Sequence, residues 1–368
     1  MINLLEKAQE LLKIFNDNGF EAYLVGGFVR DYVLNKPSTD FDICTNATPK
    51  EVKNIFNNVK LPFEGYGSVH LDFKKINFEI TTYRMDLEYK NGRSPSKIMY
   101  TDKLIIDLKR RDFIMNTLCM DKDGNIIDLL NAMDDIKNKT IRCIGDPYKR
   151  LKEDSLRILR AIRFATVLDF KLDESLKKAI IKNKRRLKKL SYFRKKQELN
   201  KIFSSPNALV GIKMIKYFGL EKYLGIKLNN VVKTNDPLGI WVQVSPSSEY
   251  QFTNNEKRYM EGILRLIKDE RITDMELYQE STYVCYIASQ ILSVDNNEIY
   301  DRYNNLPIKS ISDIDIKPIE VINLLELKDK SKVKLIMNDL AEKIINKELI
   351  NNKELLTKYI INKYKNML

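Results

Sequence analysis

The hydrophobic periodicity of this 368-residue chain changes once, near residue 140, and that change limits what the chain can fold into. Before it, amphipathic helical patterns alternate with short strand-like runs, as in a domain that mixes helices with a sheet. After Ile141 the strand signals almost vanish, and helical periodicity continues to Leu368. The sequence therefore predicts an α+β fold, with a mixed sheet in an N-terminal head followed only by helices.

Two features break the helical part. One is Pro206, and the other is the loop-like segment 231–256, which is rich in Asn, Pro and Ser. We find no internal repeat and no low-complexity tract in the sequence. The sequence also lacks an apolar run long enough for a signal peptide or a bilayer span, so we expect no membrane association.

The chain is strongly basic, with a formal net charge of +13 and a pI near 9.2. Charge of this size indicates a polyanionic partner. The segment from Lys182 to Lys201 holds ten Lys or Arg and a single acid, Glu198. Apolar residues interrupt it at helical spacing, which predicts helices with a basic outer face. The alternative is a solvated, Lys-rich surface without a partner.

Histidine and cysteine usage excludes several kinds of site. His70 is the sole histidine, which rules out a multi-histidine zinc site and an appended His/Asp metal-hydrolase module. It lies in a strand-like run, where a structural or solvent-facing role is favoured, so acid–base chemistry falls to carboxylates or to a metal. The scattered cysteines contain no CxxC pair, which predicts a reducing, cytoplasmic location; they are Cys44, Cys119, Cys143 and Cys285.

Asp40 and Asp42 lie two residues apart in a strand-like run, so their side chains leave the same face. Two carboxylates exposed near a strand end can share one or two Mg²⁺ ions, because Mg²⁺ takes few carboxylates and completes its shell with water and phosphate oxygens. The alternative for this pair standing alone is an acidic strand edge facing solvent.

A glycine pair, Gly26 and Gly27, precedes these aspartates at a predicted strand–helix turn. Glycine allows a phosphate to approach the free N–H groups of a helix start, and Arg30 can add a charged contact. The spacing fits neither GxGxxG nor GxxxxGK[ST], which excludes the dinucleotide-binding and P-loop motifs. Together with the aspartates, the turn predicts a site for a nucleoside triphosphate and Mg²⁺.

Four motifs in this order resemble the bacterial class II tRNA nucleotidyltransferases, which comprise the CCA-adding enzymes and related poly(A) polymerases. The motifs are GGFVRD (26–31), DFD (40–42), RRDFIMN (110–116) and EDSLRILRAIRFA (153–165). The resemblance extends from about residue 20 to residue 225. It implies a polymerase-β-type nucleotidyltransferase head, a helical neck that reads the base, a helical body and a helical tail that binds tRNA, expected at 1–140, 141–205, 206–270 and 271–368.

The resemblance implies that Asp40 and Asp42 are the catalytic metal ligands. A two-metal scheme would let the primer's 3′ hydroxyl attack the α-phosphate of CTP or ATP in line, with loss of pyrophosphate. Glu79, in an alternating run that predicts a neighbouring strand, is a candidate third carboxylate on geometric grounds. A surface position for Glu79 is the alternative.

The segment 153–165 offers a means of reading the base. On a helix, Asp154 and Arg157 are three residues apart, and Arg160 continues the same face. Asp154 can accept from an exocyclic amine while Arg157 donates to the adjacent ring nitrogen, a pattern that cytosine and adenine satisfy. Uracil and guanine present the reverse pattern, a carbonyl beside a ring N–H, and the mismatched polar pair would cost roughly 1–3 kcal/mol of binding free energy. An ordinary helical salt-bridge ladder is the alternative.

Further roles are implied by the resemblance alone. Glu153 would orient Arg157, Asp112 and Arg160 would recognise the ribose, and Arg163 would lie near the triphosphate. Relatives usually read RRDFTxNA where this chain departs at Ile114 and Thr117. The polar positions retained there are Arg111, Asp112 and Asn116.

A predicted exposed loop helps to separate the activities of the family. It resembles the YxxGRxP loop of CCA-adding relatives, which CC-adding relatives shorten; the matching residues are Tyr89, Asn91, Gly92, Arg93 and Pro95. We therefore predict complete CCA addition to tRNA, with the basic helices holding the acceptor end and elbow through phosphates. The alternatives are a CC-adding enzyme, a poly(A) polymerase and a non-catalytic RNA-binding protein. The sequence leaves the oligomeric state open, and we favour a monomer.

Overall fold

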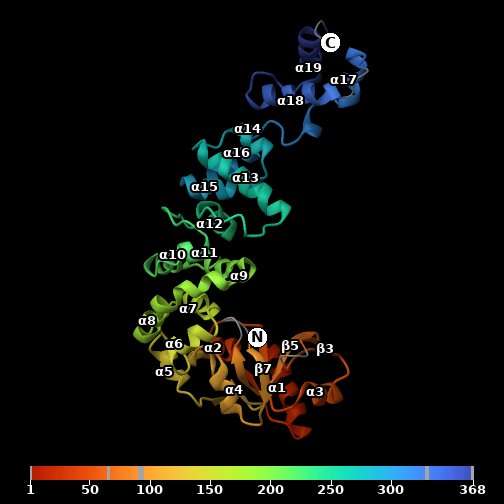
Figure 1. Cartoon of the computed structure of the whole chain (residues 1–368). Helices are drawn as coiled ribbons and strands as arrows, with labels where there is room; N and C mark the ends of the chain where they lie inside the picture. The colour runs from red at the N-terminus through yellow and green to blue at the C-terminus, as the bar shows by residue number, and fades with distance from the viewer. Residues whose placement is uncertain (1, 64–66, 90–94, 328–330, 366–368) are drawn as a thin grey trace. The chain divides into compact units, whose positions relative to one another are not determined.

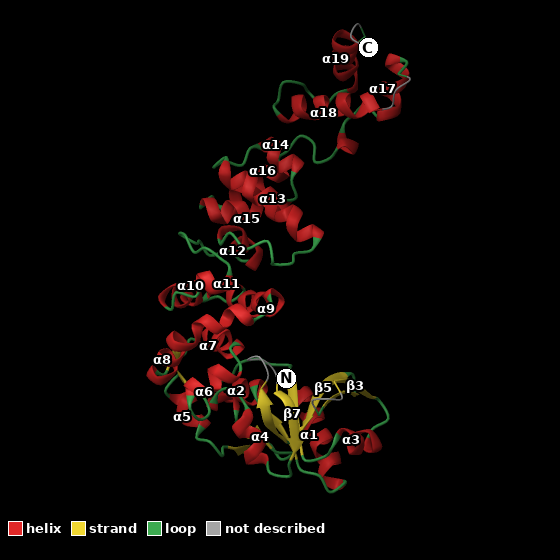
Figure 2. Cartoon of the chain, viewed as in Figure 1, coloured by secondary structure: helices red, strands yellow, loops and turns green. Residues whose placement is uncertain are grey.

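The computed structural model describes residues 2–63, 67–89, 95–327 and 331–365 (Figure 1). These residues form two compact units, Met1–Ile226 and Lys227–Leu368. Figure 2 shows the strands confined to the first unit, among the residues described, while the second is built from helices and loops. The predicted α+β fold, with a mixed sheet at the N-terminal end and helices after it, is confirmed.

A seven-stranded sheet forms the head of the first unit, and only its β2–β5 pairing is parallel. From one edge to the other its strands are β3 (Val59–Phe63), β4 (Ser68–Phe73), β5 (Ile76–Thr82), β2 (Phe41–Thr45), β1 (Ala22–Val25), β8 (Cys119–Met120) and β9 (Ile126–Ile127). The edge strand β9 is only two residues long.

The two faces of the sheet differ because side chains alternate along a strand. Phe41 of β2 is paired with Phe78 of β5, and its ring lies 5.5 Å from that of Phe78 and 4.4 Å from that of Phe28. Three helices pack on this aromatic face through Phe15, Phe28 and Phe56: α1 (Ile2–Asp17), α2 (Gly27–Val33) and α3 (Pro49–Ile55), which Phe56 follows. Burying one such ring stabilises the fold by about 1.5–3 kcal/mol. The opposite face carries Asp42 and Glu79.

The rest of the first unit is mainly helical. A hairpin of β6 (Arg84–Tyr89) and β7 (Pro95–Tyr100) comes first, and a short parallel ladder joins β10 (Thr140–Ile141) to β11 (Lys171–Leu172). The helices are α4 (Leu104–Arg110), η2 (Ile114–Asn116), α5 (Ala132–Lys137), α6 (Pro147–Glu153), α7 (Leu156–Leu168), α8 (Glu174–Asn183), η3 (Lys184–Lys189), α9 (Tyr192–Phe203), α10 (Ala208–Tyr217) and α11 (Glu221–Leu224).

Helix α7 lies at the centre of this helical part and packs against both α9 and α10. Gly211 of α10 permits the close approach, since a Cβ there would come within 2.5 Å of side-chain atoms of Thr166 and Ile202. The basic segment 182–201 is helical, as predicted, but one of its lysines does not face outward. Lys195 is buried and donates to the carbonyl of Tyr223 at 3.0 Å.

The second unit is a set of helices around its own apolar core. They are α12 (Pro237–Gln243), α13 (Asn254–Lys268), α14 (Asp274–Gln279), α15 (Thr282–Leu292), α16 (Asn296–Asn304), η4 (Ile311–Asp313), α17 (Pro318–Leu325), α18 (Ser331–Ile345) and α19 (Lys353–Tyr364). The segment 231–256, expected to be a loop, contains α12. Asp236 caps this helix, Pro237 starts it, and Trp241 is buried, so a strong helix start and an apolar side overrode the turn-rich composition.

The expected boundaries at residues 140, 205 and 270 remain predictions, since the division at Ile226 is coarser. Across the described ranges, we find no helix with the length and apolar character that a bilayer crossing requires.

Candidate active site

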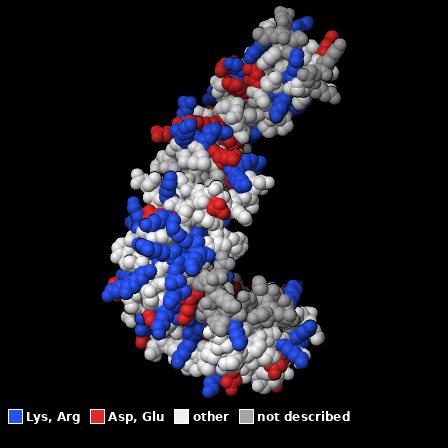
Figure 3. All heavy atoms as spheres, viewed as in Figure 1, with Lys and Arg blue, Asp and Glu red and all other residues white. Residues whose placement is uncertain are grey.

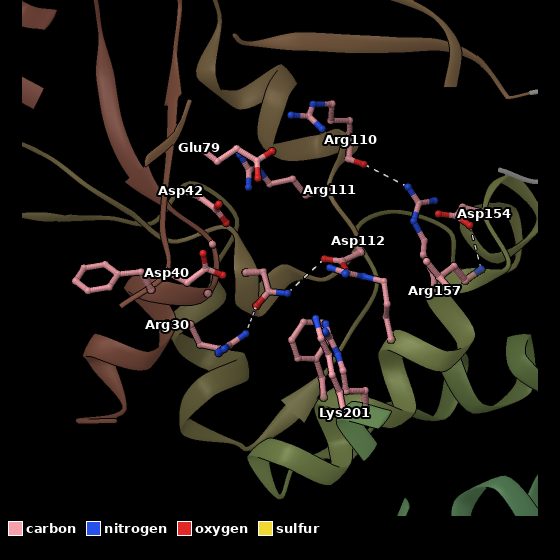
Figure 4. A pocket seen from close by; sticks show the side chains of 18 of the residues that line it. Arg30, Asp40, Asp42, Glu79, Arg110, Arg111, Asp112, Asp154, Arg157 and Lys201 are labelled. Carbon is pink, nitrogen blue, oxygen red and sulfur yellow. Dashed lines mark hydrogen bonds and ion pairs between the residues drawn. The ribbon is translucent and has the colours of Figure 1, made fainter. Parts of the chain in front are cut away.

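A cavity of about 820 Å³ opens on the carboxylate-bearing face of the sheet (Figure 4). Its walls come from the β1–α2 turn, strands β2 and β5, the segment from α4 to η2, and helices α7 and α9. The structure thus gathers residues that are as much as 175 positions apart in sequence. All the predicted site residues except Glu153 line it, namely Gly26, Gly27, Arg30, Asp40, Asp42, Glu79, Arg111, Asp112, Asn116, Asp154, Arg157, Arg160 and Arg163.

The candidate metal ligands lie together on adjacent strands. Asp42 is the direct cross-strand neighbour of Glu79, and Asp40 immediately precedes β2. Burial raises the pKa of Asp42 to about 6, and the charges of Asp40 and Glu79 add to this effect, against Arg111 and Arg160. A divalent cation bound here would relieve the repulsion among these carboxylates.

These carboxylates do not form a closed metal cage. Among the described residues, no three Asp, Glu, His or Cys side chains converge tightly enough to hold an ion by themselves. An open set of carboxylates nevertheless suits Mg²⁺, which keeps several waters and takes substrate phosphate oxygens as ligands. The residues present therefore fit a divalent metal that is completed by the nucleotide.

The glycine turn adopts a conformation that only glycine takes readily. Gly26 has φ +83° and precedes the first residue of α2, Gly27. A Cβ on Gly26 would lie 3.6 Å from Asp42 Oδ2 and 3.7 Å from Arg111 Nη1. The turn therefore brings backbone, carboxylate and guanidinium within one small region of the cavity wall.

A chain of hydrogen bonds connects this turn to helix α7 (Figure 4). Arg30 donates through Nε and Nη2 to Asp31 and through Nη1 to Asn116 Oδ1 at 2.6 Å. Asn116 Nδ2 donates to Asp112 at 3.3 Å, and Arg160 donates to the other oxygen of Asp112 at 2.6 Å. Most donors of Arg30 are thus used within the protein, which favours a role in holding the site together over one as a phosphate ligand.

Asp112 is held in its charged form. Its burial alone would raise the pKa, but Arg160 and hydrogen bonds from Asn116 and the Phe113 N–H outweigh burial and lower the pKa to about 2. The carboxylate therefore remains ionised at every physiological pH and keeps Arg160 in place.

The expectation that Asp154 and Arg157 share one helix is wrong. Helix α6 ends at Glu153 and α7 starts at Leu156, with Asp154 in an extended conformation between them. Asp154 Oδ1 accepts at 3.0 Å from the N–H of Leu156, the first residue of the new helix, and this local bond competes with continuing the old helix. The break places Asp154 and Arg157 on the cavity wall together.

Backbone carbonyls and Glu153 fix the guanidinium of Arg157. Its Nη1 donates to the carbonyl of Arg150 at 2.8 Å and lies 3.2 Å from Glu153 Oε2. Its Nη2 lies 3.4 Å from the carbonyl of Arg110. Glu153 thus stands outside the cavity lining but contacts Arg157 at i,i+4, the arrangement the resemblance implied.

Phe164 of α7 also lines the cavity, although it is not among the site residues predicted from the sequence. The guanidinium groups of three arginines surround its ring, with Arg163 at 4.2 Å, Arg30 at 5.3 Å and Arg160 at 5.4 Å from the centroid. The spacing of Arg157, Arg160 and Phe164 along one helix face could have revealed this position.

Other cavity residues were also missed. Lys201 of α9 lines the cavity and is labelled in Figure 4, although the basic segment was assigned only to tRNA. The further unpredicted polar residues in the lining are Asp31, Ser38, Ser68, Arg84, Asp86, Arg110 and Arg194. The charge run around Lys201 signalled a polyanion but not which one.

The loop that resembles YxxGRxP can be followed only in part. Tyr89 and Pro95 end β6 and begin β7 and are paired across the hairpin. Asn91, Gly92 and Arg93 lie outside the described residues. The argument from this loop stays a prediction.

Comparison with known proteins agrees with this geometry along nearly the whole chain. Residues 22–142 match the poly A polymerase head domain, residues 169–226 a probable RNA- and SrmB-binding site of polymerase A, and residues 248–360 tRNA nucleotidyltransferase domain 2. A CCA-adding enzyme of Ligilactobacillus salivarius is 32% identical, with 95% of each chain covered. The chain belongs to the CCA-adding enzymes.

Two further CCA-adding enzymes support this membership. One from Bacillus licheniformis is 29% identical, with 98% of each chain covered. The crystal structure of Bacillus stearothermophilus CCA-adding enzyme in complex with CTP superimposes with a TM-score of 0.87 at 25% identity, covering 99% of this chain and 98% of that one. The family resemblance inferred from the four motifs is confirmed, as is nucleotidyltransferase activity; the roles of individual residues remain predictions.

Proposed function

We infer that this chain adds CCA to the 3′ ends of tRNA from CTP and ATP without a nucleic-acid template. The observation that carries this inference is a single cavity that joins a carboxylate pair to a fixed Asp154–Arg157 pair. The carboxylates serve the chemistry of any added nucleotide, whereas the second pair reads its base. Membership of the CCA-adding enzymes supports the same activity.

The reaction joins a tRNA 3′ oxygen to the α-phosphorus of the incoming nucleotide. The bond from that phosphorus to the bridging oxygen breaks, pyrophosphate leaves with the electron pair, and the hydroxyl proton is released. We propose that Asp40 and Asp42, with Glu79, hold the divalent metal that the family uses, and that this metal is Mg²⁺. When bound, it supplies Lewis-acid stabilisation and lowers the pKa of the attacking hydroxyl.

Base selection follows from the hydrogen-bonding capacity of Asp154 and Arg157. The carboxylate accepts and the guanidinium donates, which matches the amine and ring nitrogen of cytosine and of adenine. Anchoring of Arg157 by the Arg150 carbonyl and Glu153 keeps the guanidinium from adapting to uracil or guanine. Uracil or guanine would leave the Asp154 carboxylate and the Arg157 guanidinium unpaired, and the free-energy cost of such unpaired groups lets a pocket reject a base strongly.

The cationic side of the cavity suits a triphosphate. Apart from Asp40, Asp42 and Glu79, its described lining holds nine Lys or Arg against four Asp. Arg160, Arg163 and Lys201 are the residues we assign to the phosphates, with the Asp112–Arg160 pair also near the ribose. Preorganised cations of this kind stabilise charge that develops on the leaving pyrophosphate.

The basic helices are proposed to bind the tRNA acceptor end and elbow. Figure 3 shows Lys and Arg gathered on the visible face of the helices directly after the sheet, whereas basic and acidic residues are mixed on the later helices. Phosphate contacts of this type weaken steeply with salt. A reducing cytoplasm is the compartment we propose, and the four cysteines are free thiols that support it.

The test is nucleotide incorporation into tRNA transcripts that lack CCA, with Mg²⁺ and each NTP alone or combined, read at single-nucleotide resolution. The expected product is three nucleotides longer, requires both CTP and ATP, and is extended no further. Addition of two cytidines only would mean a CC-adding enzyme. Long adenosine runs would mean a poly(A) polymerase, and no incorporation would mean a non-catalytic RNA-binding protein.

A further inference from the structure

A second cavity, of about 590 Å³, adjoins the candidate catalytic carboxylates. Asp40 and Glu79 line both cavities, so these two side chains stand at the boundary between them. The remaining described lining of the second cavity comes from the start of α1, from the start of β2 and the position two residues before it, and from β4, β5 and their connecting turn. It consists of Leu4, Thr39, Phe41, His70, Lys75, Ile76 and Asn77.

The strand register shows where this cavity lies relative to the chemistry. Asp42 is paired with Glu79, and Glu79 is in turn paired with His70 of β4. Directly opposed side chains share one face of a sheet. With neighbouring strands about 4.8 Å apart, His70 stands about 10 Å from Asp42 on that face, beyond Glu79. The sole histidine of the chain therefore borders the catalytic carboxylates without being one of the residues assigned to the nucleotide.

The two cavities carry different charge. The first is lined by nine Lys or Arg, including the arginines around Phe164. The second, within the described residues, has Lys75 as its single Lys or Arg, together with His70, the Asn77 amide and the apolar side chains of Leu4 and Ile76. One cation beside a carboxylate pair is too little for a triphosphate. A single nucleotide unit of an RNA strand fits this lining better, because it brings one phosphate for the cation, an apolar face of its base for the apolar side chains, and hydrogen-bonding edges for the imidazole and the amide.

The geometry of phosphoryl transfer requires such a second site. In an in-line displacement the attacking and leaving oxygens lie on opposite sides of the phosphorus. If the pyrophosphate leaves toward the arginines of the first cavity, the attacking 3′ hydroxyl must enter from the other side of the carboxylates. The second cavity begins there.

We propose that this second cavity binds the 3′-terminal nucleotide of the RNA being extended, with Lys75 on its 5′ phosphate and His70 and Asn77 against its sugar and base. The inference rests on the proposed function, because it assigns a place to the substrate of that reaction. It gives His70 a binding role in place of the structural or solvent-facing role favoured by its strand pattern.

The kinetic test uses the full chain and a tRNA transcript that ends in CC, with ATP addition as the readout. Lys75→Gln should raise the KM for tRNA about tenfold, the loss expected from one charge-assisted contact. His70→Ala should raise it about fivefold, the loss expected from one neutral hydrogen bond. Each variant should leave the KM for ATP within about twofold. Lys75→Gln should also flatten the salt dependence of tRNA binding by about one phosphate contact. The matched control is Lys60→Gln. Lys60 lies on β3, where it is paired with His70 of β4, but it does not line the cavity.

A second experiment needs no variant. A tRNA transcript carrying a photoreactive base at its last position is crosslinked to the unaltered chain, and the modified peptide is identified by mass spectrometry. We expect attachment within residues 67–79 or at the start of α1. Crosslinks confined to α7 and α9, or an unchanged KM for tRNA in both variants, would overturn the assignment. Wild-type extension of the same transcript tests the proposed function separately, so the two failures can be told apart.

Discussion

Asp42 provides the sharpest test of how this site is built, because its proposed role conflicts with the stability of the metal-free protein. Burial and two neighbouring carboxylates raise its pKa from 3.8 to about 6. A group that is harder to ionise in the folded state than in the unfolded state destabilises the fold once it is charged. At pH 8 the difference between these pKa values corresponds to about 3 kcal/mol as an upper limit, at about 1.36 kcal/mol for each pH unit.

Asp42→Asn should therefore stabilise the protein while abolishing nucleotide addition. With a chelator at pH 8, we expect the variant to gain up to about 3 kcal/mol in free energy of unfolding, or a rise of roughly 6–12 °C in the Tm of a unit of this size. The measurement is denaturant or thermal unfolding of both proteins. Such exchanges of stability for function are common at active sites.

The pH dependence of this gain follows from the direction of the pKa shift. Because the folded pKa is raised, the wild type has its full stability below about pH 3.8 and loses it as the pH rises through 6. The advantage of Asp42→Asn should be about half as large at pH 5 as at pH 8, and constant above about pH 7. Saturating Mg²⁺ should shrink or reverse it, since only the wild type gains the ligand.

Asp72→Asn is the control, since Asp72 lies on the same sheet but is exposed and bonded to Lys60. Its effect should remain within about 0.5 kcal/mol at both pH values. If Asp42→Asn were no more stable than the wild type at pH 8 without metal, the claim that these carboxylates are held together against their mutual repulsion would be refuted.

Three further substitutions probe other parts of the site and its support. Arg157→Lys should lower the preference for CTP over UTP at least about tenfold with tRNA binding little changed, because lysine lacks the guanidinium fork; unaltered selectivity, measured by competing NTPs, would remove Arg157 from base reading. Gly26→Ala should lower stability by about 1–3 kcal/mol and reduce kcat/KM, since alanine resists φ +83° beside Asp42. Gly211→Ala should destabilise by about 1–3 kcal/mol through crowding against Thr166 and Ile202, yet leave nucleotide selectivity intact; a selectivity change there would mean that α10 packing controls the base site.

Short segments of the sequence were enough to predict much of the site. The alternation around Asp40 and Asp42 predicted two carboxylates on one strand face, and the pattern around Glu79 predicted the adjacent strand. Both follow from a period of two, which a few residues suffice to reveal. The change of periodicity near residue 140 likewise predicted the division between sheet and helices, because burial of one face imposes the pattern locally.

Other features could not be predicted from sequence patterns, because they depend on competing local hydrogen bonds or on contacts between distant segments. The periodicity of 153–165 predicted an unbroken helix, but the Asp154 carboxylate bonds the Leu156 N–H and divides it. Segment 231–256 has a loop composition, yet burial of Trp241 and capping by Asp236 make α12. In both places an interaction of one side chain outweighed the average tendency of its neighbours.

The sequence by itself determined the chemistry available to this enzyme: the carboxylate pair, the glycine turn, the Asp154–Arg157 pair and a basic surface. Only the tertiary structure decided how they work together. Arg30 donates a hydrogen bond to Asn116, which is 86 positions away in sequence. The ring of Phe164 contacts the guanidinium groups of three arginines, which come from α2 and α7. Periodic patterns report contacts within about one helical turn or one strand pair, whereas contacts between distant segments are set by how whole faces pack around a shared core.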